Sequence, residues 1–287
     1  MNIEVKGHSG CQIEVVREGN DLFVYKSTHD KGYLDRLNLQ GQKQQEAAKL
    51  ELQHIRIPKI YETKRTSDSV VLKMEYVYSK NFVGYFEHAG FEQIDYFIKA
   101  LCLYLDYEVQ HSPMQLVKAD VLKTKFEDVY KKTTNNPVLK DDKEVADILS
   151  RSAAHFEAVE DMMLPVGKCH GDLTFSNILF NGNNYYLIDF LDSFVESPLL
   201  DIVKIRQDSA FLWSQLMFSG DYDEIRLRIV ADKVDKEIVR YASKYDWFNR
   251  YYTLYQLMNF LRVLQYAKEE RVINYLKRII NQLLHEF

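Results

Sequence analysis

Apolar and polar residues alternate along the first part of the chain, up to about residue 76. Alternation with a period of two is typical of half-buried strands, because successive side chains point to opposite faces of a sheet. We predict strands at 2–6, 12–17, 22–26, 59–62 and 70–76. One further segment of this part, 42–54, carries alanine and leucine among good helix formers and is predicted to be a helix.

Beyond residue 76, apolar positions recur every three to four residues, as they do on amphipathic helices. We predict helices at 91–110, 115–131, 141–161, 198–218, 223–244, 247–268 and 270–285. An irregular, strand-like segment at 168–190 interrupts this series. The pattern predicts an α+β protein with a small β-rich N-lobe, residues 1–77, and a larger helical C-lobe, residues 78–287, that meet near Tyr78.

The interrupting segment holds the polar residues that carry most chemical information. Asn177 precedes a predicted strand at 178–180. Asp189 follows a second predicted strand at 185–188. A turn at 181–184 makes the two strands a hairpin, which brings Asn177 and Asp189 to the same end. An amide oxygen and a carboxylate suit Mg²⁺, because this cation prefers oxygen ligands and shares them with phosphate.

A second acid lies one loop upstream of the hairpin, in the sequence His170-Gly171-Asp172. Asp172 is close enough along the chain to reach a substrate hydroxyl beside the metal site. One carboxylate that accepts a proton, together with metal ligands that neutralise phosphate charge, is the set that kinase-like phosphoryl transfer requires. We therefore expect Mg²⁺ as cofactor and ATP or GTP as co-substrate.

A kinase also requires a backbone turn that can approach phosphate groups. Gly7, Ser9 and Gly10 lie between the first two predicted strands, where such a turn belongs. The order of the features favours a kinase more than any one of them does. A glycine turn, a strand lysine, a helix acid, two strands and a set of helices precede the catalytic segment.

A kinase further requires a lysine that grips the α- and β-phosphates and a helix acid that pairs with this lysine. Lys26 ends the third predicted strand, so it is our candidate for the phosphate contact. Glu46 lies on the next predicted helix beside two alanines and is the expected partner. Glu51 on the same predicted helix is the alternative.

The pattern His-Gly-Asp at 170–172, Asn177 and Ile-Asp-Phe at 188–190 resembles the aminoglycoside phosphotransferase and choline kinase superfamily. The segment 198–201, Pro-Leu-Leu-Asp, extends the resemblance, since that family carries a proline and an aspartate shortly after the metal-binding aspartate. The resemblance implies a protein-kinase-like fold of two lobes and covers the chain from about Gly7 to Asp201. Leu191 departs from the glycine that many kinases carry after the metal-binding motif.

The resemblance also implies a role for each residue that matches the motif. Asp172 would be the catalytic base, and His170 would orient its loop without acting as the base. Asn177 and Asp189 would bind the metal, and Asp201 would brace the catalytic loop. In kinase folds the connector between lobes offers backbone groups to the purine, so Glu75 and Val77 become candidates for nucleotide contact.

Few residues separate Asp189 from Pro198, and the chain has no Ala-Pro-Glu sequence. A long loop that receives a protein substrate is therefore absent from the pattern, and we expect a small hydroxyl-bearing acceptor such as a sugar, an amino alcohol or an aminoglycoside. Acidic side chains would suit amino groups, and aromatic faces would suit a quaternary ammonium or a sugar ring. The candidate wall residues are Asp192, Glu196, Trp213, Trp247, Tyr251 and Tyr255.

Charge and composition limit the classes of partner that the protein is expected to bind. A net charge of −5 disfavours binding to nucleic acid or to an anionic membrane surface. The start of the chain lacks the apolar run of a signal peptide. The three cysteines show no zinc-site spacing, and one of them, Cys11, adjoins the glycine turn. We therefore expect a cytoplasmic protein. The sequence leaves open the acceptor, the choice between ATP and GTP, any role of Cys11 and the oligomeric state.

Two other functions compete with an active kinase. A kinase-like module that binds nucleotide without turnover would lack the base or a metal ligand, whereas this chain retains Asp172, Asn177 and Asp189. A helical scaffold protein with a chance motif would have no reason to carry the ordered features of the first lobe.

Overall fold

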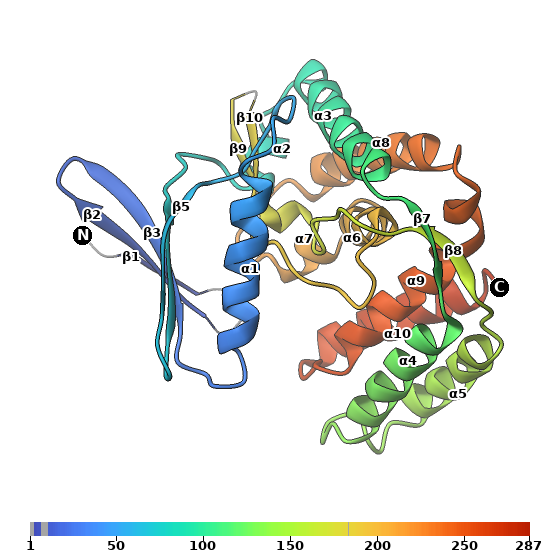
Figure 1. The fold of residues 1–287 in the computed structure, drawn as a ribbon. Coiled ribbons are helices and arrows are strands. Elements are labelled where there is room, and N and C mark those ends of the chain that lie inside the picture. Colours follow the sequence, from blue (N-terminus) through green and yellow to red (C-terminus); the bar gives the residue numbers. More distant parts are fainter. Residues whose placement is uncertain (1–2, 7–10, 183) are drawn as a thin grey trace. The chain divides into compact units, whose positions relative to one another are not determined.

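The N-terminal part of the chain forms an antiparallel sheet of five strands in the order β1-β2-β3-β6-β5 (Figure 1). The computed structural model describes residues 3–6, 11–182 and 184–287. The strands are β1 (Ile3–Lys6), β2 (Gln12–Glu18), β3 (Asp21–Thr28), β5 (Ile60–Arg65) and β6 (Val70–Glu75). All five predicted strands are confirmed, and no end is shifted by more than three residues.

Helix α1 (Leu34–Ala47) lies along one face of this sheet (Figure 1). The predicted helix at 42–54 is wrong in its bounds, because the helix begins eight residues earlier and ends at Ala47. Its buried stripe consists of Leu34, Leu37, Gln40, Gly41 and Gln44, which recur at the spacing of one helix face. Glutamine or glycine occupies three of these five positions, so the buried stripe has only a weak hydrophobic pattern.

The core of this region lies between α1 and the sheet. Leu34 and Leu37 from the helix pack with Val70 and Leu72 from β6, and the buried thiol of Cys11 belongs to the same cluster. At Gly41 a Cβ atom would lie 2.8 Å from a methyl group of Leu72, so glycine permits the close approach of helix and strand.

A second, smaller sheet carries the predicted hairpin. β9 (Ile178–Asn181) pairs antiparallel with β10 (Asn184–Leu187), which confirms the hairpin, and β10 pairs parallel with β4 (Ile55–Arg56). Aromatic rings hold the hairpin against α2 (Phe82–Phe86) and α3 (Phe91–Gln110). The ring of Phe180 stacks on that of Tyr85 at 4.3 Å, and the Tyr185 ring contacts Phe97 at 5.0 Å. The hairpin is therefore fixed by burial as well as by its ladder.

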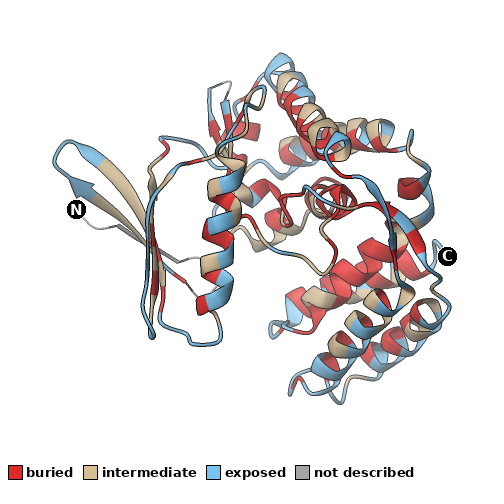
Figure 2. Cartoon of the chain, viewed as in Figure 1, coloured by how far each residue is buried: buried red, intermediate tan, exposed pale blue. Residues whose placement is uncertain are grey.

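Most of the remaining chain is helical, as predicted, but the predicted helix at 198–218 is divided into two helices, and the start of the predicted helix at 115–131 is a strand. The helices are α4 (Ala119–Thr134), α5 (Lys143–Glu157), α6 (Pro198–Ser209), α7 (Trp213–Met217), α8 (Glu224–Ala242), α9 (Asp246–Leu264) and α10 (Glu270–Leu284). Helix α9 is buried along most of its length (Figure 2) and packs against α4, α6 and α10. A two-stranded sheet of β7 (Met114–Val117) and β8 (Met162–Pro165) was not predicted, because four-residue strands carry too short a pattern.

The described residues form two compact units. The first comprises Met1–Tyr104, His170–Ser193 and Asp221–Val230, and the second comprises Leu105–Cys169, Phe194–Gly220 and Ala231–Phe287. Within the first unit, aromatic contacts join the hairpin to α2 and α3, and β10 pairs with β4, while the predicted boundary near Tyr78 stays a prediction. No helix among the described residues combines the length and apolar character needed to cross a bilayer.

Candidate active site

His170 fastens the loop that contains Asp172 to the end of the hairpin. Its Nε2 lies 2.9 Å from the carbonyl oxygen of Ile188, and its Nδ1 lies 3.2 Å from the backbone nitrogen of Asp172. A carbonyl only accepts and a backbone N–H only donates, so the ring is neutral with its proton on Nε2. The ring is fully buried and contacts the Phe190 ring at 4.2 Å. With both nitrogens engaged, His170 is suited to hold the loop and not to accept a proton.

Gly171 allows the loop to lie against the segment that follows Asp189. Its φ is +88°, and a Cβ atom at this position would lie 2.1 Å from the carbonyl oxygen of Leu191. The neighbouring backbone bond runs from Leu191 N–H to the carbonyl oxygen of His170 at 2.9 Å. Only glycine fits this contact.

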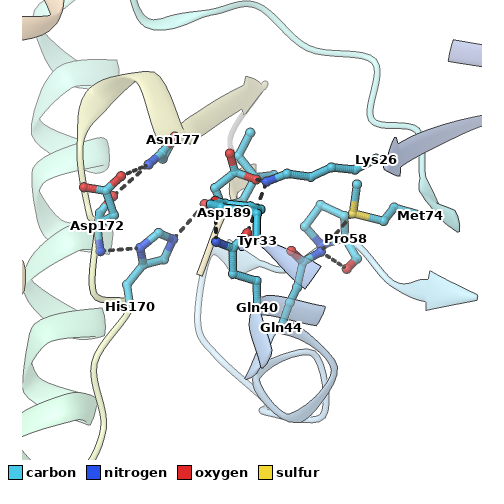
Figure 3. Close-up of polar contacts among 11 residues, drawn as sticks. Lys26, Tyr33, Gln40, Gln44, Pro58, Met74, His170, Asp172, Asn177 and Asp189 are labelled. Atoms are coloured by element: carbon cyan, nitrogen blue, oxygen red, sulfur yellow. Dashed lines mark hydrogen bonds and ion pairs between the residues drawn. The ribbon is translucent and has the colours of Figure 1, made fainter. Parts of the chain in front are cut away.

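Asp172 and Asn177 form a direct pair (Figure 3). The Asn177 Nδ2 group donates to the Asp172 carboxylate and to the Asp172 carbonyl oxygen, both at 2.9 Å. Because both hydrogen bonds use Nδ2, the amide oxygen of Asn177 has no donor among the described residues. That oxygen is therefore available as a ligand, and the amide fixes the orientation of the carboxylate.

Asp189 lies beside Asn177 at the end of the hairpin. The N–H of Ile188 donates to the carbonyl oxygen of Asn177 at 3.1 Å, so the backbones of the two segments are adjacent at this point. Asp189 itself has a φ of +62°, a conformation that costs a non-glycine residue strain and recurs at functional sites. Its Oδ1 accepts from Lys26 Nζ at 2.7 Å (Figure 3), and its Oδ2 has no hydrogen-bond donor among the described residues.

Lys26 lies on β3 with its side chain only 4% exposed, against 34% for Asp189. The predicted pair of Lys26 with Glu46 is wrong. Glu46 is exposed and forms an ion pair with Lys49 at 2.6 Å, whereas Glu51 is exposed beyond the end of α1. The error follows from the helix bounds, since a helix from 42 to 54 would have presented other residues to the sheet.

Gln40 occupies the position expected for the helix acid. Its Oε1 lies 3.4 Å from Lys26 Nζ, and its Nε2 donates to the Tyr33 hydroxyl at 3.0 Å (Figure 3). Gln40 is buried and carries no charge, so α1 does not neutralise the Lys26 ammonium. That charge is balanced by Asp189. Sequence reasoning missed Gln40, because a glutamine in a polar run carries no signal of burial.

Lys43 is a second residue of α1 that sequence reasoning missed. Its Nζ donates to the carbonyl oxygen of Leu191 at 2.5 Å. The same nitrogen lies 3.4 Å from the Cβ position of Gly171. Lys43 is three residues after Gln40, so both lie on the face of α1 that is directed toward the catalytic loop and the Asp189 segment.

The face of the sheet that carries Lys26 also carries half-buried valines. Val24 on β3 is directly opposite Val15 on β2 and Met74 on β6. Such a surface would suit the apolar faces of a purine, which is the expectation for a nucleotide floor. Gly7, Ser9 and Gly10, the predicted phosphate turn, lie outside the described residues.

The predicted purine connector begins at the end of β6. The backbone N–H of Glu75 donates to the carbonyl oxygen of Lys59 at 2.8 Å. The Glu75 carboxylate accepts from the backbone N–H of Lys59 at 3.1 Å. Val77 is buried, and its carbonyl oxygen accepts from the Ser79 hydroxyl at 3.2 Å. A contact of either residue with nucleotide stays a prediction.

The predicted acceptor residues do not form one set. Asp192 is exposed in the first unit, and the others belong to the second unit. The Glu196 carboxylate accepts from the Cys169 thiol at 3.2 Å. Trp247 and Tyr255 are buried, which disfavours their role as pocket walls. In the second unit, Trp213 packs on Tyr275, and Tyr251 is half-buried.

Asp201, the residue predicted to brace the catalytic loop, is fully buried on α6.

The donor set fits a cation that is shared with phosphate. Among the described residues, no three His, Cys, Asp or Glu side chains form a ready metal cluster. Asn177 Oδ1 and Asp189 Oδ2 supply two hard oxygen atoms. Mg²⁺ is commonly held by one or two protein oxygens, with phosphate and water completing its octahedron. The arrangement therefore fits Mg²⁺ bound together with a nucleotide better than a free metal ion.

Comparisons with known proteins bear on the family and the fold of this chain. Residues 103–232 match a phosphotransferase enzyme family, and this range contains His170, Asp172, Asn177, Asp189 and Asp201. No curated protein sequence matches the chain.

Similar solved structures span nearly the whole chain. A thermostable mutant of aminoglycoside phosphotransferase APH(4)-Ia in apo form has a TM-score of 0.67 at 10% identity, with 100% of this chain and 94% of that chain covered. The complex of APH(2")-IIia with GDP and kanamycin has a TM-score of 0.66 at 13% identity, with 100% and 93% covered. Amicoumacin kinase hAmiN, in complex with AMP-PNP, Ca²⁺ and Ami, has a TM-score of 0.65 at 10% identity, with 99% and 88% covered.

At these identities the structural likeness establishes the fold, and the family match concerns the segment that holds the catalytic loop. The predicted kinase-like α+β fold and the resemblance predicted from the sequence are both confirmed. The chain thus has the fold of the aminoglycoside phosphotransferases, and its residues 103–232 match the phosphotransferase enzyme family.

Proposed function

We propose that this protein is a small-molecule phosphotransferase that moves the γ-phosphate of a nucleoside triphosphate onto a hydroxyl group. One observation carries the proposal: a single loop and the hairpin after it hold Asp172, Asn177 and Asp189 close together. Asp189 also forms an ion pair with Lys26. All four residues belong to the same compact unit. The family match over 103–232 supports the same class of reaction.

Asn177 and Asp189 would hold Mg²⁺ through Oδ1 and Oδ2. When bound, the ion neutralises the charge of the nucleotide phosphates. Lys26 is placed to contact the phosphates from the sheet. Its ion pair with Asp189 orients this carboxylate before nucleotide arrives.

Asp172 would act as the base. The acceptor oxygen attacks the γ-phosphorus and forms a P–O bond, and the bond from the γ-phosphorus to the β,γ-bridging oxygen breaks. The nucleoside diphosphate leaves with that oxygen, and Asp172 takes the proton of the acceptor hydroxyl. Asn177 Nδ2 holds the Asp172 carboxylate in place for this transfer, while His170 fixes the backbone of the loop.

A small acceptor fits the chain better than a protein substrate. Asp189 and the start of α6 at Pro198 are nine residues apart, which leaves no room for a long substrate-binding loop. The solved relatives carry small molecules, among them kanamycin and hygromycin B, together with GDP, ADP or AMP-PNP. We therefore test both ATP and GTP as donors.

The test measures nucleotide binding and turnover separately. A ligand that binds only the folded state raises the melting temperature, so ATP or GTP with Mg²⁺ should stabilise the wild-type protein. Asp189→Ala should lose the Mg²⁺-dependent part of this shift. Asp172→Asn should retain the shift and lose at least about a hundredfold in diphosphate release with an acceptor mixture.

Asp232→Asn is the matched control, since Asp232 is exposed on α8 and forms an ion pair with Lys236 at 2.6 Å. Normal turnover in Asp172→Asn would refute the role of Asp172 as base. A Mg²⁺-dependent shift without turnover by the wild-type protein on any acceptor would favour a nucleotide-binding module. The absence of any shift with either nucleotide would refute the proposed function.

A further inference from the structure

A pocket of about 500 Å³ lies on the five-stranded sheet, beside the beginning of β3 and the end of β6. Phe23 on β3 and Tyr61 on β5 line it, together with Glu75 at the end of β6. Every residue that lines it belongs to the first compact unit. The whole pocket is therefore contained in that unit.

The pocket lies on the face of the sheet that is opposite to Lys26. Successive side chains of a strand point to opposite faces, so Phe23 and Lys26, three positions apart, lie on opposite faces of β3. Helix α1 contacts Lys26 through Gln40 and so packs on the other face from the pocket. Lys26 is the proposed phosphate contact, and the pocket is therefore separate from the proposed nucleotide site.

Two pairs of aromatic rings form walls of this pocket. Phe23 and Tyr61 meet edge to face with their centres 5.5 Å apart, and Tyr76 and Tyr78 do the same at 4.9 Å. Phe23 and Tyr76 are half-buried, whereas Tyr61 is 56% exposed and Tyr78 is 70% exposed. In each pair a half-buried ring thus orients an exposed one. The faces of such rings attract cations, because the ring quadrupole places negative charge there.

One cation of the chain already uses this attraction. The Lys73 ammonium lies 4.0 Å from the centre of the Phe23 ring. It also donates to the Glu18 carboxylate at 2.5 Å, and Glu18 does not line the pocket. The charge of Lys73 is therefore matched by a carboxylate outside the pocket.

Two carboxylates that line the pocket, those of Asp21 and Glu75, form no ion pair with any described residue. Asp21 precedes Phe23 by two positions on β3, and Glu75 is directly opposite Phe23 on β6, so both acids share the face of that ring. Glu75 Oε2 accepts from the Lys59 N–H, which leaves Oε1 without a donor in the described part of the chain. The pocket thus combines aromatic faces with unmatched negative charge.

This combination favours a guanidinium group over other cations. A guanidinium is planar, stacks on aromatic rings and donates to carboxylates through a rigid fork of N–H groups. The ammonium of lysine is a compact and strongly hydrated charge, and a quaternary ammonium has no N–H group for Asp21 or Glu75. A flat cation with donors along its edge uses both the rings and the carboxylates.

The exposure of the walls favours a side chain of another protein over a free small molecule. Small-molecule sites bury most of their ligand, whereas Tyr61 and Tyr78 are themselves more than half exposed. Tyrosine and arginine are both enriched at protein interfaces, where one side chain inserts into a pocket of the partner. We propose that this pocket receives an arginine side chain of a partner protein, with its guanidinium against the tyrosine rings and its N–H groups bonded to Asp21 and Glu75.

The test uses three peptides that differ in one side chain. Each is acetyl-Gly-Ser-X-Ser-Gly-amide, in which X is arginine, lysine or citrulline, the last having the shape of arginine without its charge. Binding to the full chain is measured by NMR titration at physiological salt without nucleotide. The arginine peptide should shift the amide signals of Asp21 and Phe23. It should bind about tenfold more tightly than the citrulline peptide and about threefold more tightly than the lysine peptide.

Variants of the full chain test the carboxylate and the ring separately. Asp21→Asn should weaken binding of the arginine peptide by about tenfold and leave the citrulline peptide unchanged. Tyr61→Leu should weaken binding of the arginine peptide by about threefold, because a ring face is lost. Glu14→Gln is the matched control for charge. Glu14 is opposite Tyr25 on the pocket face of the sheet but does not line the pocket, and its variant has the same net charge as Asp21→Asn.

Four results would each overturn the proposed arginine site. They are no saturable binding of the arginine peptide, equal binding of the arginine and citrulline peptides, tighter binding of the lysine peptide, and equal effects of Asp21→Asn and Glu14→Gln. Binding of agmatine, a free guanidinium compound, without binding of the arginine peptide would replace the partner protein by a small molecule and so also overturn it. None of these results bears on the proposed function, because nucleotide is absent from every measurement.

Discussion

At the residue scale, backbone conformation explains several positions of the candidate site. Gly171 has a positive φ and lies in contact with the Leu191 carbonyl, and Asp189 has a positive φ without being glycine. The strain at Asp189 is held by its ion pair with Lys26 and by the backbone bond from Ile188 to Asn177. Strain of this kind persists only where the surrounding contacts over-determine the conformation.

The two glycines with positive φ at 19 and 171 provide a matched test. Gly171→Ala should cost about 3 kcal/mol or more of the free energy of unfolding, because strain adds to the contact with Leu191. Gly19→Ala should cost only about 1 kcal/mol, because no atom lies within 4 Å of its Cβ position. Urea denaturation of both variants measures the difference, and equal losses would show that the loop adapts.

At the element scale, α1 determines how Lys26 is held. Its buried face presents Gln40 and Gln44, and neither is acidic. Gln44 Nε2 donates to the Pro58 carbonyl oxygen at 2.9 Å, so this glutamine joins the helix to the segment before β5. Gln40 contacts Lys26 without neutralising it, and therefore Asp189 is the counter-ion of Lys26 within the described part of the chain.

This arrangement predicts an effect of charge on α1. Gln40→Glu places a carboxylate beside Lys26 that competes with Asp189 for the ammonium, which frees Asp189 to bind Mg²⁺. The Mg²⁺ concentration for half-maximal nucleotide stabilisation should fall roughly threefold. Gln42→Glu, exposed on the same helix, should leave it unchanged. A rise in the required Mg²⁺ concentration in Gln40→Glu would contradict the competition.

At the scale of the whole molecule, each compact unit is assembled from segments far apart in sequence. In the first unit, Arg226 on α8 donates through Nε to the Phe86 carbonyl oxygen at 2.9 Å, and through its guanidinium to that of Ala89. The Glu87 carboxylate accepts from the Asp223 N–H at 2.8 Å. These contacts attach the segment Asp221–Val230 to the end of α2.

Arg226→Met should therefore destabilise the first unit by about 2 kcal/mol, because two carbonyl groups lose a charged donor. Both tryptophans, Trp213 and Trp247, lie in the second unit, so their fluorescence reports that unit. Backbone amide exchange in α2 reports the first unit and should accelerate in Arg226→Met. Arg228→Met, at an exposed position two residues away, should not change it. Unchanged exchange in both variants would refute this role of Arg226.

The sequence by itself determined the α+β class, the strands of the first sheet, the hairpin and the motif of Asp172, Asn177 and Asp189. These features have local causes, because alternation, turn residues and spacing act within a few positions of the chain. Tertiary structure alone decided that α1 begins at Leu34, that Gln40 and Asp189 are the contacts of Lys26, and that Phe23, Tyr61 and Glu75 line one pocket. Each of these depends on burial and charge between residues far apart in sequence, which no local pattern records.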